Sequence, residues 1–145
     1  GRPIDVYDDP ASLFVAGFIG SPAMNFLPGR RAGDEVDIGG GVRIALPPDL
    51  RADAPDAVTV GVRPEHLVAG PGAGGPAFRF NVETVEALGA DSMVHGEFGN
   101  GTVVARVEGH ATPPMGETLL FSVMPGKLYF FDSITGKRIG PRARP

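Results

Sequence analysis

The stretch SMVHGEFGNGTVVARVE, residues 92–108, decides the fold class of this chain. Apolar and polar side chains alternate on both sides of Asn100-Gly101, in 92–98 and again in 102–108. A period of two indicates a strand with one buried face, and Asn-Gly between two such runs is typical of a type I′ hairpin. We therefore expect 92–98 and 102–108 to pair as antiparallel strands.

Other short runs of the same kind lie on either side of this hairpin. They cover 24–27, 35–38, 42–46, 58–62, 78–88, 118–124 and 127–131. Turn signals separate them: Pro28-Gly29, the glycines at 39–41, Pro47-Pro48, and a low-complexity segment at 69–77 that we expect to be a flexible loop. Short strands at regular spacing predict an all-β barrel or sandwich.

One short helix is expected near the start of the chain. Asp9 is suited to be the N-cap and Pro10 the first helical residue, which predicts a helix over 10–19 that ends before Gly20 and Pro22. Its apolar side chains surround the helix, so we expect it to be covered on more than one side. They include Leu13, Phe14, Phe18 and Ile19.

Composition excludes several classes of protein. The 145 residues are 42% hydrophobic and 21% charged, with 22 glycines and 15 prolines, which is typical of a globular, turn-rich chain. Cysteine is absent, which excludes disulfides, iron–sulfur clusters and thiol catalysis. A net charge of −4 without a basic cluster argues against nucleic-acid binding. The first residue is Gly rather than Met, so we expect the chain to be part of a longer protein.

Few side chains suggest chemistry on their own. His66, His95 and His110 lack metal-ligand spacing, and a structural role is favoured for each. Glu83 and Glu86 could act as an acid–base pair, but a solvated strand face is the favoured interpretation. Glycines at 39–41 and 70–75 lack the lysine and the following helix of a phosphate loop. Asp91-Ser92 predicts a tight turn whose side chains bond to the local backbone.

Arg63-Pro64-Glu65-His66 is the most unusual local cluster in the chain. Pro64 fixes a bend and biases Arg63 toward an extended backbone. Arg63 and Glu65 could pair or could hold an interface. A structural corner between strands and a binding site both stay open on this pattern.

Four segments in order resemble the ATP-binding subunits of sugar and glycerol-3-phosphate ABC importers of the maltose-importer type. DVYDDPASLFVAGFIGSPAMNFL at 5–27 resembles the segment that follows the nucleotide-binding domain of these subunits. VGVRPEHL at 60–67, VETVEALGADSMVHG at 82–96 and ETLLFSVMPGKLYFFD at 117–132 are similar to elements of their regulatory domain. The combination of FIGSP, RPEHL and LGAD is specific, whereas each alone is weak.

The resemblance implies an all-β, OB-fold-like barrel of the TOBE type with a short N-terminal helix. Residues 1–22 would be a linker and helix after a nucleotide-binding domain, 23–140 the barrel, and 141–145 a frayed tail. It also implies a homodimer, contact with the nucleotide-binding domain and, indirectly, with permease subunits, and in some bacteria control by a signalling protein. No nucleic-acid partner is implied, and the location would be cytoplasmic, on the inner face of the membrane.

Catalysis is not expected in this chain. The sequence holds no Walker A motif, no LSGGQ signature and no apolar strand ending in Asp-Glu, so ATP and magnesium would bind in the preceding domain and no cofactor or metal here. Candidate interface or regulatory residues are the following: Arg63, Glu65, His66, Gly89, Asp91 and Ser92. The alternative is a module that senses a small ligand or oxyanion, for which Ser92 and Lys127 are the isolated candidates.

Overall fold

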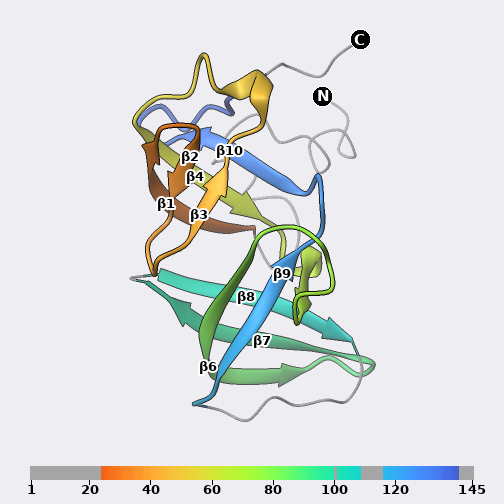
Figure 1. The fold of residues 1–145 in the computed structure, drawn as a ribbon. Helices are drawn as coiled ribbons and strands as arrows, with labels where there is room; N and C mark the ends of the chain where they lie inside the picture. The colour runs from red at the N-terminus through yellow and green to blue at the C-terminus, as the bar shows by residue number, and fades with distance from the viewer. Residues whose placement is uncertain (1–23, 100, 109–115, 141–145) are drawn as a thin grey trace. The chain divides into compact units, whose positions relative to one another are not determined.

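The computed structural model describes residues 24–99, 101–108 and 116–140 (Figure 1). The expected helix over 10–19, with Leu13, Phe14, Phe18 and Ile19, lies outside the described residues, as do the linker 1–22, His110 and the tail 141–145. The described part is all-β, as expected, with ten strands and two short 3₁₀ turns. The described residues divide into two compact units, one comprising 24–61 and 129–140, the other comprising those between Val62 and Leu128.

The first unit contains one five-stranded sheet. Its strand order is β10-β4-β1-β2-β3. The strands are β1 (Asn25–Ala32), β2 (Glu35–Asp37), β3 (Arg43–Ala45), β4 (Ala57–Val62) and β10 (Leu128–Asp132), and the 3₁₀ turn η1 (Pro48–Leu50) lies between β3 and β4. β1 pairs antiparallel with β2, and β2 with β3. As predicted from the alternation at 42–46, Ile44 and Leu46 are buried whereas Arg43 and Ala45 are exposed.

Pro28-Gly29 does not end the first strand, contrary to our expectation. β1 continues through both residues to Ala32. Pro28 is exposed, and Gly29 lies so close to β2 that a Cβ there would be 2.7 Å from the carbonyl oxygen of Asp37. The missing side chain therefore permits close pairing at Gly29 rather than a turn.

β4 is buried on both faces, whereas the alternation at 58–62 predicted one buried face. Thr59 is 5% exposed, and its hydroxyl is hydrogen-bonded to the hydroxyl of Ser133 at 2.7 Å. At Gly61 a Cβ would lie 2.6 Å from the sulfur of Met24 and 2.9 Å from the ring of Phe131. The second face is thus filled by side chains from the two ends of the unit, which the alternation itself does not reveal.

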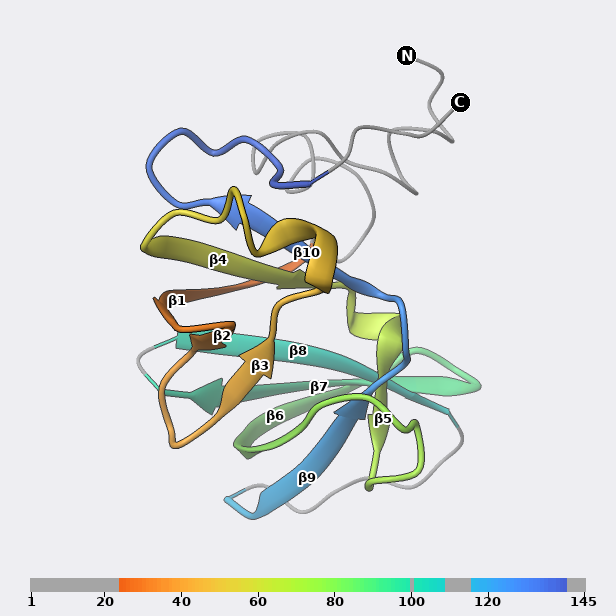
Figure 2. The same ribbon diagram turned by 45° about the horizontal axis from the view of Figure 1, so that its top comes forward.

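The second unit contains the other five-stranded sheet, shown from two directions in Figures 1 and 2. Its order is β5-β9-β6-β7-β8, and each strand pairs antiparallel with its neighbours. The strands are β5 (Leu67–Ala69), β6 (Ala77–Ala87), β7 (Asp91–Phe98), β8 (Gly101–Glu108) and β9 (Thr118–Val123), with η2 (Pro64–His66) before β5. The edge strands β5 and β8 also lie close to each other, so the sheet curls toward a barrel.

The expected hairpin is present, with its turn one residue earlier than predicted. β7 and β8 pair from Asp91↔Glu108 to Phe98↔Gly101 without a register shift. Gly101 is therefore the first residue of β8 rather than a turn residue. Gly99 has a φ of 58°, which glycine adopts at low cost.

Phenylalanine side chains form the interior of the second unit. The rings of Phe80 and Phe121 stack with centroids 4.4 Å apart, and those of Phe78 and Phe98 meet edge to face at 4.9 Å. All four residues are at most 7% exposed. These rings serve as core, as their alternation predicted, and are not available for stacking on nucleic-acid bases.

Gly96 is required by the close approach of β6 and β7. A Cβ at Gly96 would lie 2.3 Å from both the carbonyl oxygen of Asn81 and the ring of Phe80. We expect Gly96→Ala to lower the free energy of unfolding by about 1–3 kcal/mol, because the buried backbone and ring must move. Urea denaturation measures this change. Gly101→Ala is the matched control, since its nearest heavy atom would be 3.9 Å away, and an equal loss in both variants would contradict the steric argument.

Candidate functional site

The Arg63–His66 corner is built around Pro64, as the sequence predicted. Arg63 is extended, with φ −76° and ψ 144°, and Pro64 is the first residue of η2. The N–H of His66 donates to the carbonyl of Arg63 at 3.0 Å, which closes the turn. Because proline carries no N–H and fixes φ, it suits the first position of such a turn.

The side chains of this corner differ in access to solvent. Arg63 is 1% exposed, Glu65 is exposed and His66 is partly buried. η2 lies beside β8, within the second unit. Glu65 and His66 are therefore the members of this cluster that a partner could reach, while Arg63 belongs to the interior.

The pKa of His66 lies below its ordinary value of 6.5. Burial is the largest cause, because it disfavours the charged imidazolium, and the positive charges of Lys127 and Arg63 act in the same direction. Glu65 opposes them. The Nδ1 atom of His66 is also buried without a hydrogen-bond partner, so a second proton on the ring would be poorly accommodated.

The expected turn at Asp91-Ser92 is differently bonded than predicted. The N–H of Leu88 donates to the carbonyl of Asp91 at 2.8 Å, and Gly89 has a φ of 90°. The carboxylate of Asp91 accepts a hydrogen bond from Nε of Arg106 at 2.8 Å, across the β7–β8 pair. This bond to another strand takes the place of the predicted bond to the local backbone. Ser92 lies within β7 and is 5% exposed. Gly89 and Asp91 are thus the accessible members of this second group.

The residues considered for acid–base, oxyanion or metal chemistry do not form one site. Glu83 and Glu86 are both exposed, and Glu86 lies 3.9 Å from Nε2 of His95 as a surface pair. Lys127 is exposed between β9 and β10, whereas Ser92 is buried in β7. In the described ranges no three His, Asp or Glu side chains are grouped to hold a metal ion.

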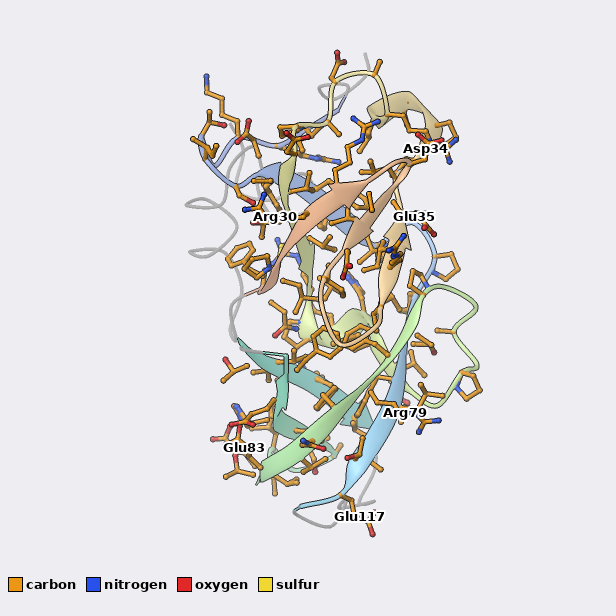
Figure 3. The ribbon with its side chains drawn as sticks, turned by 60° about the vertical axis from the view of Figure 1, so that its left-hand side comes forward. Arg30, Asp34, Glu35, Arg79, Glu83 and Glu117 are labelled. Atoms are coloured by element: carbon orange, nitrogen blue, oxygen red, sulfur yellow. The ribbon has the colours of Figure 1, made fainter. Side chains whose placement is uncertain are left out.

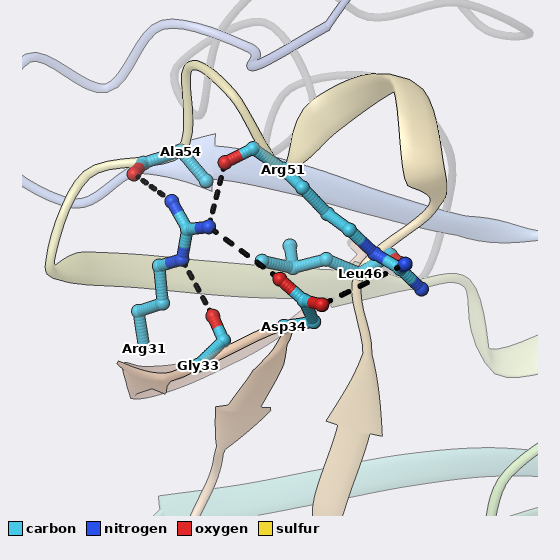
Figure 4. A network of polar contacts seen from close by, with 6 residues as sticks. All are labelled: Arg31, Gly33, Asp34, Leu46, Arg51 and Ala54. Atoms are coloured by element: carbon cyan, nitrogen blue, oxygen red, sulfur yellow. Dashed lines mark hydrogen bonds and ion pairs between the residues drawn. The ribbon is translucent and has the colours of Figure 1, made fainter.

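Arg31 organises a polar network that the sequence did not indicate (Figure 4). Its guanidinium donates to the carbonyls of Gly33, Arg51 and Ala54 at 2.7, 2.6 and 2.7 Å. Nη2 also lies 3.9 Å from the carboxylate of Asp34. Three carbonyls and a carboxylate thus surround this side chain, which ties the β1–β2 turn to the segment that follows η1. This is a structural network rather than an anion site.

Arg30 and Arg31 are neighbours in β1, and their side chains point to opposite faces of the sheet. Arg30 is exposed, whereas the side chain of Arg31 is only 22% exposed. An Arg-Arg pair in a strand thus presents one side chain on each face. The Arg-Arg pair is thus the sequence signal that one arginine side chain faces inward. The pair does not reveal the acceptors, because two of them are carbonyls of the distant residues Arg51 and Ala54.

Family comparison decides what these two units are. Residues 20–67 match the MalK OB fold domain, and residues 60–131 match the TOBE domain. Together the two matches cover most of the chain and meet at the Arg63–His66 corner. The chain belongs to the OB and TOBE domains of ABC importer ATP-binding subunits.

Two curated relatives of this OB/TOBE chain are named sn-glycerol-3-phosphate import ATP-binding protein UgpC. The protein of Ruegeria pomeroyi is 47% identical over 141 residues, and that of Escherichia coli is 40% identical over 141 residues. In both cases 96% of this chain is covered, but only 38% and 39% of the relatives. The OB/TOBE chain therefore spans less than two-fifths of their length.

A solved structure shares the fold of this OB/TOBE chain. The cytoplasmic molybdate-binding protein ModG, with molybdate bound, superposes with a TM-score of 0.57 at 14% identity. The likeness covers 73% of this chain and 94% of that one. At this identity it concerns the fold alone. Within the part of the chain that the structure describes, no helix is long and apolar enough to cross a membrane.

Arg31 is expected to stabilise the first unit strongly. Arg31→Met removes the donor to three carbonyls and leaves the two partly buried acceptors, on Arg51 and Ala54, unsatisfied, so the free energy of unfolding should fall by about 2 kcal/mol. Urea denaturation measures the loss. Arg30→Met is the matched control, because Arg30 is exposed in the same strand and its loss should change stability by less than about 0.5 kcal/mol. Equal effects of the two substitutions would show that the network is not stabilising.

Acid should weaken the fold through His66. Its pKa is lowered in the folded state, so the unfolded chain binds the proton more readily. The stabilisation from neutral His66 is complete above the unfolded value of 6.5 and is lost as the pH falls toward the lowered folded value. We expect His66→Gln to reduce the drop in urea midpoint between about pH 7.5 and 5.5. His95→Gln is the control on the sheet surface, and an unchanged drop in His66→Gln would contradict the assignment.

Proposed function

We propose that this chain is the regulatory and dimerisation domain of the ATP-binding subunit of an ABC importer for a sugar, for sn-glycerol-3-phosphate or for glycerophosphodiesters. The identity of 40–47% to UgpC relatives over 96% of the chain carries this proposal. The order of elements adds support, since the OB and TOBE matches follow one another along the chain.

The domain's role would be mechanical rather than chemical. Its sequence lacks the Walker A and LSGGQ motifs, so ATP and magnesium would bind in the nucleotide-binding domain of the whole subunit. The partners would be that domain, a second copy of the subunit and, through them, the permease subunits. A signalling protein would be a further partner of this domain. The subunit would work in the cytoplasm, on the inner face of the membrane.

Contact between two copies of this domain would involve the second unit. Two groups of accessible residues were expected at such an interface: Glu65 and His66 on η2, and Gly89 and Asp91 at the β6–β7 turn. Arg63 and Ser92 would support these groups from the interior, since both are at most 5% exposed.

A chimeric subunit tests the proposal. This chain replaces the matching part of the Escherichia coli relative, in cells that lack their own subunit, and uptake of labelled sn-glycerol-3-phosphate is measured. We expect uptake to be restored, and the chain alone to show no turnover of ATP with magnesium. The control is the Escherichia coli subunit from which the matching part is removed and not replaced. A chimera that accumulates and hydrolyses ATP but gives no uptake would contradict the role in coupling.

A further inference from the structure

Ile134 is the most exposed large apolar side chain in the described part of the chain. It is 86% exposed, whereas the next three, Val68, Leu88 and Met124, are between 36% and 47% exposed. A single apolar residue on a surface is common and needs no function of its own. Ile134 differs because the turn that presents it, residues 132–137 after β10, is held in one conformation. We name these residues the Ile134 turn.

Hydrogen bonds within the Ile134 turn fix its backbone. The carboxylate of Asp132 accepts from the N–H groups of Ile134 and Thr135 at 2.8 and 3.1 Å. The carbonyl of Asp132 accepts from the N–H of Gly136 at 2.8 Å, and the N–H of Asp132 donates to the carbonyl of Lys137 at 2.8 Å. Because the turn is already ordered, little conformational freedom would be lost when a partner covers Ile134.

The Ile134 turn is also fastened to the sheet of the first unit. The N–H of Ser133 donates to the carbonyl of Ala57 at 3.0 Å, and its hydroxyl is hydrogen-bonded to that of Thr59 at 2.7 Å. Both partners belong to β4, the neighbour of β10 in the sheet. In the second unit the loop at 70–76, which we expected to be flexible, is likewise bonded, to the hydroxyl of Ser122. The position of Ile134 in the first unit is therefore set by the sheet as well as by the turn.

The first described residue lies in the same unit, close to this turn. Met24 is 4% exposed and packs in one cluster with Phe131 of β10. Phe131 is three residues before Ile134, and the ring of Phe26 meets the ring of Phe131 edge to face at 6.0 Å. The chain that precedes Met24 therefore enters the first unit beside the strand that leads into the Ile134 turn.

The opposite edge of the same sheet presents charged side chains instead. In the order β10-β4-β1-β2-β3, the two edge strands are β10 and β3. Arg43 of β3 is exposed, and its guanidinium lies 4.0 Å from the carboxylate of Glu35. Figure 3 labels Glu35 together with Arg30 and Asp34 on and beside β1 and β2. Burying such charges is costly, whereas burying Ile134 leaves no charge without water, so the β10 edge is better suited to a contact.

We propose that the Ile134 turn is where the nucleotide-binding domain of the same subunit contacts this chain, and that Ile134 is the side chain buried there. This rests on the proposed function, which includes that domain as a partner. This chain covers only 38% and 39% of the two relatives, so the larger part of such a subunit is available to cover the turn. Thr135 and Lys137 are exposed beside Ile134 and would form a polar rim. The complementary surface would be an apolar socket bordered by a carboxylate or carbonyl that faces Lys137.

Thiol labelling tests the proposal, because the chain contains no cysteine and an introduced thiol reports on one position. Ile134→Cys is made in the isolated chain and in the chimeric subunit, and its reaction with a maleimide is followed by mass spectrometry of that peptide. We expect labelling to be at least about tenfold slower in the chimera, since a covered thiol reacts only when the contact opens. Arg43→Cys is the matched control, exposed on the opposite edge of the same sheet, and should react equally fast in both proteins. Urea midpoints confirm that both variants fold.

Three other outcomes would overturn the inference. Equal labelling rates of Ile134→Cys in the two proteins would show that the turn is not covered in the subunit. Slow labelling in the isolated chain that becomes faster on dilution would place a second copy on the turn instead. Equally slowed labelling of both thiols in the chimera would show general shielding rather than a contact at this turn. Uptake by the chimera decides the proposed function separately, so uptake with an uncovered thiol would refute the contact alone.

Discussion

The pairing of β9 with both β5 and β6 is the constraint on which the second unit depends. β9 is formed by residues 118–123, yet its partners are 67–69 on one side and 77–81 on the other. This pairing stacks Phe121 on Phe80 in the interior, and it turns Ser122 toward the opposite face. One strand thus supplies part of the core and the anchor of the loop at 70–76.

Long connections in both units are fixed by side chains that bond to backbone groups. Arg31 holds the segment around Arg51 and Ala54, Ser122 holds Gly70 and Ala73, and the carboxylate of Asp132 accepts the N–H groups of Ile134 and Thr135. Buried or partly buried backbone groups need such partners when they lie outside strands. A chain rich in glycine and proline can therefore present ordered loops, and ordered loops are what a recognition surface requires.

The Arg63–His66 corner connects the family assignment to the geometry. It lies where the OB and TOBE matches overlap, and it is the last element before β5. Pro64 sets the bend, Arg63 is enclosed, and Glu65 and His66 remain accessible beside Met124. The corner can therefore have a structural role and also be accessible to a partner. The two roles that its sequence left open, a structural corner and a binding site, do not exclude each other.

Local patterns in the sequence were sufficient for the strands other than β5, for the β7–β8 hairpin and for the phenylalanine core, because alternation and turn residues act over a few positions. They also identified the corner at Pro64, where one residue limits the backbone. They were misleading at Pro28-Gly29, where the glycine serves close strand pairing, and at Asp91, whose partner Arg106 is on another strand. The network of Arg31 and the bonds of Ser122 to Gly70 and Ala73 were decided by tertiary structure alone. Each joins residues far apart in the chain, and only the order and register of strands determine which distant residues meet.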